Sequence, residues 1–224
     1  MPLPRAPQAV VFDMDGVLIA SEQLYREAIF ASCGALGYAM THEQHQQMIG
    51  APWDRNRAQL AGWFGDDFPA EAYLADCSVR FHAMIEDGVP LRPGVPELVA
   101  FLASEGIPSA VATSARRASA TEHLTQAGLI DGFRAVVTRD DVSHGKPHPE
   151  VFLTAAHRLG VDPAHCLALE DSHNGVRAAS AAGMMTVMVP DLLDATPEIA
   201  GQCVHVARDL HEVRDMLEAA MATA

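Results

Sequence analysis

Two aspartates one residue apart follow a short apolar run near the start of the chain. Asp13 and Asp15 come directly after residues 9–12, and Gly16 follows them at once. An apolar run that ends in this way is typical of a buried strand that opens into a loop. Two desolvated carboxylates repel each other unless a cation joins them, and Mg²⁺ prefers such oxygen ligands. The alternative is an acidic turn after an edge strand.

A second acidic pair repeats this arrangement late in the chain. Glu170 and Asp171 follow the apolar run 166–169, and Ser172 and Asn174 can cap a helix behind them. Because this pair also sits at a strand end, it makes a metal site plausible. The alternative is a helix N-terminus, which favours acidic residues through the helix dipole.

Two further segments could contact a phosphate group. Thr113 ends the apolar run 109–113, and Ser114 follows it. A hydroxyl with exposed N–H groups at a strand end can bind a phosphoryl oxygen. Lys146 is the chain's one lysine and stands next to Pro147, which stiffens its loop. The alternatives are that Thr113 and Ser114 are ordinary turn or helix-cap residues and that Lys146 is a solvated surface lysine.

The elements that must position these residues alternate in type. Strands are predicted at 9–12, 109–113, 133–138, 166–169, 184–189 and 205–207. Helices are predicted at 21–36, 41–50, 52–64, 69–86, 95–105, 116–127, 149–159, 174–182 and 210–220. This alternation predicts an α/β fold with a Rossmann-like parallel sheet, and the helices after the first strand form an inserted domain. The expected domains are residues 1–18 with 91–224, and residues 19–90.

In a parallel sheet the carboxyl ends of the strands lie at one edge, where α/β proteins place their ligands. Asp13, Thr113, Lys146 and the Glu170–Asp171 pair each follow a predicted strand. We therefore expect a single crevice that holds carboxylates, a hydroxyl and a lysine.

Composition limits the partners of the chain. Its 224 residues carry a net charge of −14 and are 49% hydrophobic, which argues against nucleic acid or an anionic membrane as a partner. We find no 18-residue apolar run and no apolar signal region, so we expect a cytoplasmic protein. The four cysteines show no metal-ligand spacing and are expected to be reduced. A monomer or a weak homodimer is expected.

This set of motifs closely resembles the haloacid dehalogenase (HAD) superfamily of phosphotransferases. Within it, the chain is similar to the subfamily of β-phosphoglucomutase and small sugar-phosphate phosphatases, which carry an α-helical cap domain after the first motif. The matching segments are FDMDGVLIASE, VATSA, GKPHPEVF and ALEDSHNGVRAA, and they span the core from end to end. The implied fold is a HAD core with an inserted helical cap.

The resemblance implies a role for each matching residue. Asp13 would be the nucleophile that forms an aspartyl-phosphate, and Asp15 would protonate the leaving group and then activate water. Thr113 and the N–H of Ser114 would hold the phosphoryl group, and Lys146 would neutralise its charge. The implied Mg²⁺ ligands are Asp13, Asp15 through its backbone carbonyl, Glu170 and Asp171. Gly16 is expected beside the substrate.

The chain departs from the mutase pattern at two places in the cap. Tyr25 stands where β-phosphoglucomutases have a His, and no Arg follows Gly50 until Arg55. Both departures favour a phosphatase, and Asp15 argues against dehalogenation. The candidate specificity residues of the cap are Tyr25, Trp53, Arg55, Asn56 and Arg57. In the alternative reading Trp53 is a core residue and the two arginines are solvated.

The leading hypothesis is a Mg²⁺-dependent phosphatase that acts on a small phosphate monoester. A hexose-phosphate mutase and a non-catalytic binding protein on the same fold are the alternatives. Residues 18–20 and 88–93 are expected to act as hinges of the cap. His42, His45 and His82 lack ligand spacing and are expected at the surface.

Overall fold

The computed structural model describes residues 3–49, 51, 53–86 and 88–222. Predictions that involve Gly50 and Pro52 therefore lie outside the described residues. The chain divides into two compact units, one formed by Met1–Ala20 with Val89–Ala224 and the other by Ser21–Gly88. In the part of the chain that the structure describes, no helix combines the length and the apolar character needed to cross a membrane.

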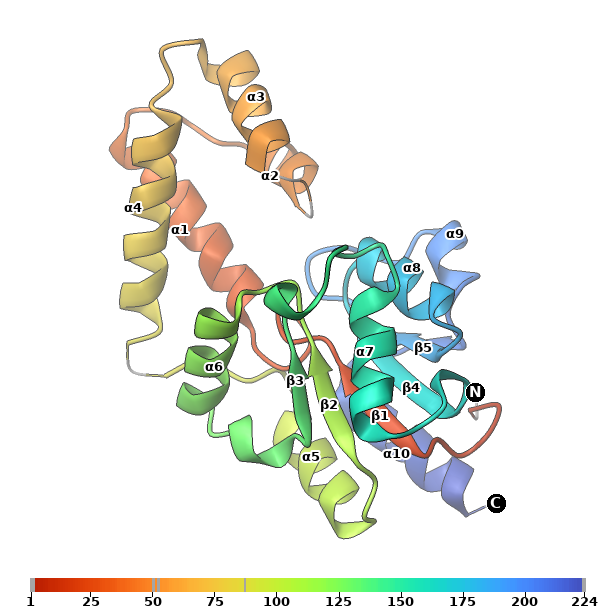
Figure 1. Cartoon of the computed structure of the whole chain (residues 1–224). Coiled ribbons are helices and arrows are strands. Elements are labelled where there is room, and N and C mark those ends of the chain that lie inside the picture. Colours follow the sequence, from red (N-terminus) through yellow and green to blue (C-terminus); the bar gives the residue numbers. More distant parts are fainter. Residues whose placement is uncertain (1–2, 50, 52, 87, 223–224) are drawn as a thin grey trace. The chain divides into compact units, whose positions relative to one another are not determined.

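The first unit is built on a six-stranded sheet in the order β3-β2-β1-β4-β5-β6, in which every pairing is parallel (Figure 1). The strands are β1 (Ala9–Phe12), β2 (Ser109–Ala112), β3 (Ala135–Val137), β4 (Cys166–Glu170), β5 (Met185–Met188) and β6 (His205–Val206). This arrangement confirms the predicted α/β parallel-sheet class. β1 is central, so the residues that follow it lie in the middle of the sheet edge.

Helices cover both faces of this sheet. They are α5 (Val95–Ser104), α6 (Arg117–Gln126), α7 (Glu150–Leu159), α8 (His173–Ala181), α9 (Pro197–Ala200) and α10 (Leu210–Met221). The short helix α9 and three 3₁₀ turns, Ile130–Gly132, Arg139–Asp141 and Pro163–His165, were not predicted by the sequence pattern.

The face of the sheet under α7 and α8 is rich in alanine. Ala9 and Val11 of β1 point to this face because side chains alternate along a strand. They pack with alanines of β2, α7 and α8 in one buried cluster. Figure 1 shows α7 in front of the strands and α10, which packs against α5, behind them. Small side chains let the helices lie close to the strands, so the strand ends are held firmly.

The second unit is helical and has its own core. It contains α1 (Ser21–Ala35), α2 (His42–Met48), α3 (Trp53–Phe64) and α4 (Ala70–Met84), and α1 packs along α4. Its buried cluster is largely aromatic and sulfur-containing; it includes Cys33, Met48, Leu60, Phe68, Tyr73 and Cys77. All four cysteines of the chain are free thiols in this structure.

One histidine prediction in this unit is wrong. His45 is only 5% exposed, and its ring lies 5.8 Å from that of Phe30, whereas His42 and His82 are exposed. Burial lowers the pKa of His45, and Arg26 adds to the effect. The sequence of α2, HEQHQQM, carries almost no apolar periodicity, so nothing in it indicated which histidine faces the core.

The two connections at Ile19 and Leu91 run side by side in the first unit. Ile19 forms an antiparallel bridge with Leu91, and Ala20 N–H donates to the Pro90 carbonyl oxygen at 2.8 Å. The Arg92 guanidinium donates to the Asp191 carboxylate at 2.7 Å and to the Pro190 carbonyl oxygen at 2.9 Å. These contacts tie both connections to the loop after β5.

Asp141 joins the loops that follow β2 and β3. Its carboxylate accepts hydrogen bonds from the Thr138 backbone and hydroxyl and from the guanidinium groups of Arg117 and Arg158. Its side chain is 8% exposed. Burial opposes ionisation, but the Arg158 and Thr138 hydrogen bonds outweigh it and hold the pKa of Asp141 below its usual range. The network fixes the start of the loop that carries Lys146.

Asp141→Asn should lower the free energy of unfolding at pH 7 by about 2 kcal/mol, because charge-assisted hydrogen bonds are lost. A carboxyl group whose pKa is lower in the folded than in the unfolded chain stabilises the fold at pH values above its unfolded-state pKa. This stabilisation is lost as the pH falls toward its folded-state pKa. The difference between the two proteins should therefore shrink below about pH 4. Urea denaturation at a series of pH values measures it.

The exposed Asp131→Asn variant is the control and should match the unchanged chain throughout. An Asp141→Asn deficit that stays constant down to pH 2 would show that lost packing, not charge, is responsible.

Candidate active site

The sheet register brings the predicted site residues to one edge. Asp13 N–H donates to the Leu169 carbonyl oxygen at 2.9 Å, so the residue after β1 lies beside the end of β4. Thr113 N–H donates to the Val137 carbonyl oxygen at 2.9 Å, which places it beside the end of β3. The ladder hydrogen bonds thus extend one residue past the strands and fix the backbone from which Asp13 and Thr113 project.

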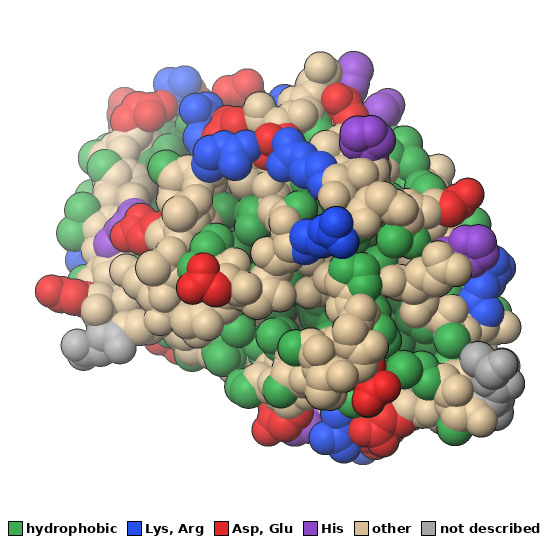
Figure 2. All heavy atoms as spheres, turned by 60° about the horizontal axis from the view of Figure 1, so that its bottom comes forward, with side chains coloured by type: hydrophobic (Ala, Val, Ile, Leu, Met, Phe, Trp, Pro, Cys, Tyr) green, Lys and Arg blue, Asp and Glu red, His purple; other side chains and the backbone are tan. Residues whose placement is uncertain are grey.

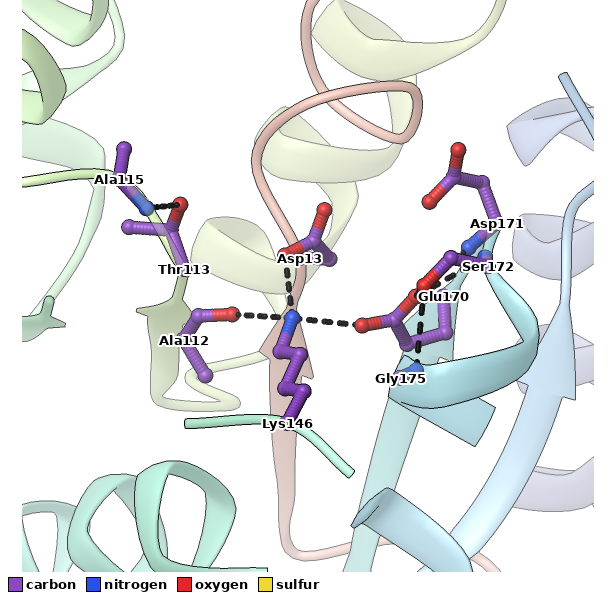
Figure 3. Close-up of polar contacts among 9 residues, drawn as sticks. All are labelled: Asp13, Ala112, Thr113, Ala115, Lys146, Glu170, Asp171, Ser172 and Gly175. Carbon is purple, nitrogen blue, oxygen red and sulfur yellow. Dashed lines mark hydrogen bonds and ion pairs between the residues drawn. The ribbon is translucent and has the colours of Figure 1, made fainter. Parts of the chain in front are cut away.

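Lys146 reaches this edge from the loop between β3 and α7. Its ammonium nitrogen lies 2.5 Å from Asp13 Oδ1, 2.6 Å from Glu170 Oε1 and 3.0 Å from the Ala112 carbonyl oxygen (Figure 3). Its side chain is 7% exposed, and those of Asp13 and Glu170 are 10% and 0% exposed. The three donors of the ammonium group are therefore matched by three acceptors.

The electrostatics of this group are tightly coupled. Burial raises the pKa of Asp13, the neighbouring charges of Glu170 and Asp15 raise it further, and Lys146 opposes them. Burial alone would lower the pKa of Lys146, but the attraction of Asp13 and Glu170 outweighs it and raises that pKa. Lys146 is thus held as a cation, and the edge retains more carboxylates than its single ammonium group can balance.

Thr113 is oriented by its own loop. Its hydroxyl oxygen accepts the N–H of Ala115 at 2.9 Å, which leaves the hydroxyl proton to donate elsewhere (Figure 3). The side chain is almost fully buried, whereas Ser114 is exposed. A hydroxyl donor at the same sheet edge as the buried Asp13 suits an anionic group that approaches this carboxylate.

Gly16 makes room for Asp171. A Cβ atom on Gly16 would lie 2.2 Å from Asp171 Oδ2, and the φ of Gly16 is +80°. Both the left-handed backbone and the close approach therefore require glycine here. The structure gives Gly16 this spacing function between the two acidic pairs, while the sequence pattern indicated only a position beside the substrate.

Gly175 has a matching function beside Glu170 that the sequence analysis missed. A Cβ atom there would lie 1.8 Å from Glu170 Oε1, so only glycine fits in the first turn of α8. The other oxygen of Glu170 accepts hydrogen bonds from Asp171 N–H at 3.0 Å and from the backbone and hydroxyl of Ser172. A glycine inside a predicted helix was the available signal.

The carboxylates at this edge are suited to a divalent cation. Among the described residues, Asp13, Glu170 and Asp171 each offer an oxygen, and these oxygens all lie within 4.8 Å of one another. The donor set consists of hard oxygens, which Mg²⁺ prefers. Both oxygens of Glu170 accept hydrogen bonds, Oε1 from the Lys146 ammonium and Oε2 from the Ser172 hydroxyl.

A family model for haloacid dehalogenase-like hydrolases matches residues 7–183, and therefore spans all of these residues. The chain belongs to the haloacid dehalogenase-like hydrolase family. This assignment confirms the resemblance of its four motifs to that superfamily.

Curated relatives of this hydrolase include hexitol phosphatase B of Escherichia coli K12. It is 33% identical over 199 residues, covering 85% of this chain and 86% of the relative. A phosphorylated carbohydrates phosphatase of Thermotoga maritima is 34% identical over 181 residues and covers 79% and 82% of the two chains. A solved HAD family hydrolase from Deinococcus radiodurans, with bound phosphate and sodium, shares 28% identity with a TM-score of 0.84 over 97% of each chain.

The cap candidates of this hydrolase lie in its helical unit. Tyr25 is partly exposed and packs edge-on against Phe81, and Trp53 packs against the buried cluster of that unit. Arg55 and Arg57 are exposed, and the Asn56 amide donates to the Met48 carbonyl oxygen at 3.1 Å. On the face drawn in Figure 2, arginine side chains (blue) lie beside Asp and Glu side chains (red).

Gly16→Ala in this hydrolase should displace Asp171 and reduce turnover by about 10²-fold, the usual effect of a small misplacement in a site. Gly183→Ala is the matched control, since Gly183 has a φ of +79° but nothing within 4 Å of its added Cβ. Urea denaturation and phosphate release are measured on both variants. Equal activity losses in the two variants would assign the effect to backbone strain alone.

Proposed function

We propose that the chain is a Mg²⁺-dependent phosphatase that hydrolyses a small sugar or sugar-alcohol phosphate through an aspartyl-phosphate on Asp13. The family and the phosphatases among its relatives make it a phosphoric monoester hydrolase. The observation that carries the proposal is the buried Lys146 ammonium between Asp13 and Glu170, beside Thr113. The hexitol and carbohydrate phosphatases, which share about a third of the aligned residues with this chain, support the proposed substrate class.

In the first step Asp13 attacks the phosphorus atom. Lys146 holds Oδ1 of Asp13, so the remaining oxygen forms the new P–O bond while the bond to the leaving oxygen breaks. Asp15, two residues further on, donates a proton to that leaving oxygen. The Thr113 hydroxyl and the Ser114 N–H hold the transferred phosphoryl oxygens as their charge redistributes.

In the second step Asp15 acts as a base. It takes a proton from a water molecule whose oxygen attacks the phosphorus atom. The bond to Asp13 then breaks, which releases inorganic phosphate and restores the carboxylate. Splitting the reaction in two lets one carboxylate carry the phosphoryl group and the other carry the proton.

The residues proposed to hold Mg²⁺ are Asp13, Asp171 and the carbonyl of Asp15, with Glu170 orienting Lys146 and the Asp171 loop. The chemistry that Mg²⁺ supplies when bound is neutralisation of the charges on the carboxylates and the phosphate. This neutralisation reduces the repulsion between an anionic substrate and a chain whose net charge is −14.

We further propose that the Ser21–Gly88 unit acts as a cap that selects the substrate. Tyr25, Trp53 and Arg55 are the side chains that we assign to this selection. Position 25 carries Tyr where β-phosphoglucomutases have a His, and the first Arg after Gly50 is Arg55. Both differences favour hydrolysis over the transfer of a phosphoryl group between two positions of a sugar.

Asp13→Asn should abolish phosphate release while the chain still folds, because the amide keeps the shape of the carboxylate but cannot form the acyl phosphate. Asp15→Asn should lower turnover by about 10²–10⁴-fold, the usual share of a general acid–base group. Circular dichroism and thermal unfolding check the fold of both variants. Near-normal turnover in Asp13→Asn would exclude it as the nucleophile, and a loss under about tenfold would exclude Asp15 from proton transfer.

Phosphate release from a panel of monoesters should require Mg²⁺ and should stop with EDTA. The panel contains hexitol phosphates, hexose 6-phosphates, a pentulose bisphosphate, β-glucose 1-phosphate and phosphoglycolate as a non-sugar monoester, with glucose 6-phosphate followed separately. Sugar-alcohol or sugar phosphates should be the best substrates. Formation of glucose 6-phosphate without phosphate release would establish the mutase alternative, and unchanged turnover in EDTA would refute the metal requirement.

A further inference from the structure

A second group of metal-ligating side chains comes from residues on either side of Lys146 in the chain. His144, His148 and Glu150 each offer one ligand atom, and these three atoms lie within 4.8 Å of one another. His144 Nδ1 lies 3.0 Å from Glu150 Oε2, and His148 Nδ1 lies 3.8 Å from the same oxygen. This donor set shares no residue with the Asp13–Glu170–Asp171 set.

The backbone holds these three side chains close together. The Glu150 carboxylate accepts the backbone N–H groups of Ser143 and His144, both at 2.9 Å. His148 N–H donates to the Gly145 carbonyl oxygen at 3.0 Å, which closes a turn around Lys146. The two imidazole rings lie 4.6 Å apart at an angle of 35°. Little rearrangement is needed to bring the three donors onto one ion.

The ring nitrogens can exchange their present contacts for a metal ion. Glu150 N–H donates to His148 Nδ1 at 3.3 Å, so this nitrogen carries a lone pair and not a proton, and an ion would replace this long hydrogen bond. The carboxylate of Glu150 has about four lone-pair sites, of which two accept backbone N–H groups and one contacts His144 Nδ1, the contact that an ion would replace. The imidazoles are more than half exposed, so water can complete the coordination.

The chemistry of this set differs from that of the carboxylate set. Two imidazoles with one carboxylate favour Zn²⁺ and its neighbours over Mg²⁺, which prefers oxygen ligands. With bonds of about 2.0 Å, two ligand atoms of a tetrahedral ion lie about 3.3 Å apart. The distances of 3.0 and 3.8 Å from Glu150 Oε2 bracket this value.

We propose that His144, His148 and Glu150 form a binding site for a transition-metal ion such as Zn²⁺ on the loop that carries Lys146. When the ion binds, bonds to the ion replace the hydrogen bond between His144 Nδ1 and Glu150 Oε2, and a proton shared by these two atoms passes to solvent. The ion joins residues on both sides of Lys146, so its binding stabilises the folded loop. The site does not depend on the proposed reaction.

The test uses the full chain without a histidine tag, with millimolar Mg²⁺ present to occupy the carboxylate set. Zn²⁺ is titrated against a chromophoric chelator, and the thermal unfolding midpoint is recorded with and without Zn²⁺. Co²⁺ absorption in the visible range gives an independent reading of nitrogen and oxygen ligands. The variants are His144→Ala, His148→Ala and their combination.

Two controls separate this site from others. His157→Ala removes an exposed histidine of α7 outside the cluster, and Asp171→Asn weakens the carboxylate set. The unchanged chain and both controls should bind one Zn²⁺ and gain thermal stability. Each single histidine variant should weaken binding by about tenfold or more, and the double variant should lose the stability gain.

Zinc affinity of the double variant within about twofold of the unchanged chain would overturn the proposal. Loss of zinc binding in Asp171→Asn with retention in the double variant would assign the ion to the carboxylate set instead. Neither result depends on phosphate release, so the proposed phosphatase activity is tested independently of this zinc site.

Discussion

The buried ion group of Asp13, Lys146 and Glu170 is the constraint on which the core unit depends. Transfer of each charge from water into a protein costs several kcal/mol, and only fixed partners offset that cost. The ammonium group therefore needs both carboxylates and the Ala112 carbonyl oxygen at hydrogen-bond distance. The strand ends, the proline-flanked loop and the Asp141 network all serve to hold these atoms in place.

The sequence predicted the parallel sheet and the strand-end residues because both depend on local patterns. Asp13, Thr113 and Glu170 follow apolar runs, and parallel strands place their ends at one edge. The contact between Lys146 and Asp13 joins residues 133 positions apart. The strand-end rule predicted that both residues share one crevice, and the resemblance of the motifs indicated that Lys146 contacts the nucleophile.

Other features could not be predicted because they depend on packing. The steric need for glycine at positions 16 and 175 appears only once the neighbouring carboxylates are placed in space. His45 is buried through its contact with Phe30, which lies on another helix. Asp141 belongs to a short turn, and its partners Arg117 and Arg158 come from α6 and α7. Each of these outcomes is set by tertiary contacts, which override local sequence preference.

The single lysine of the chain has a consequence for its surface chemistry. The ammonium of Lys146 is buried, and its raised pKa keeps it protonated, so it is a poor nucleophile toward acylating reagents. All other cationic side chains that are charged at neutral pH are arginines, which such reagents leave unmodified. Covalent labelling of side-chain amines would therefore report on one atom only, and its rate would measure how often the Asp13–Lys146–Glu170 group opens to solvent.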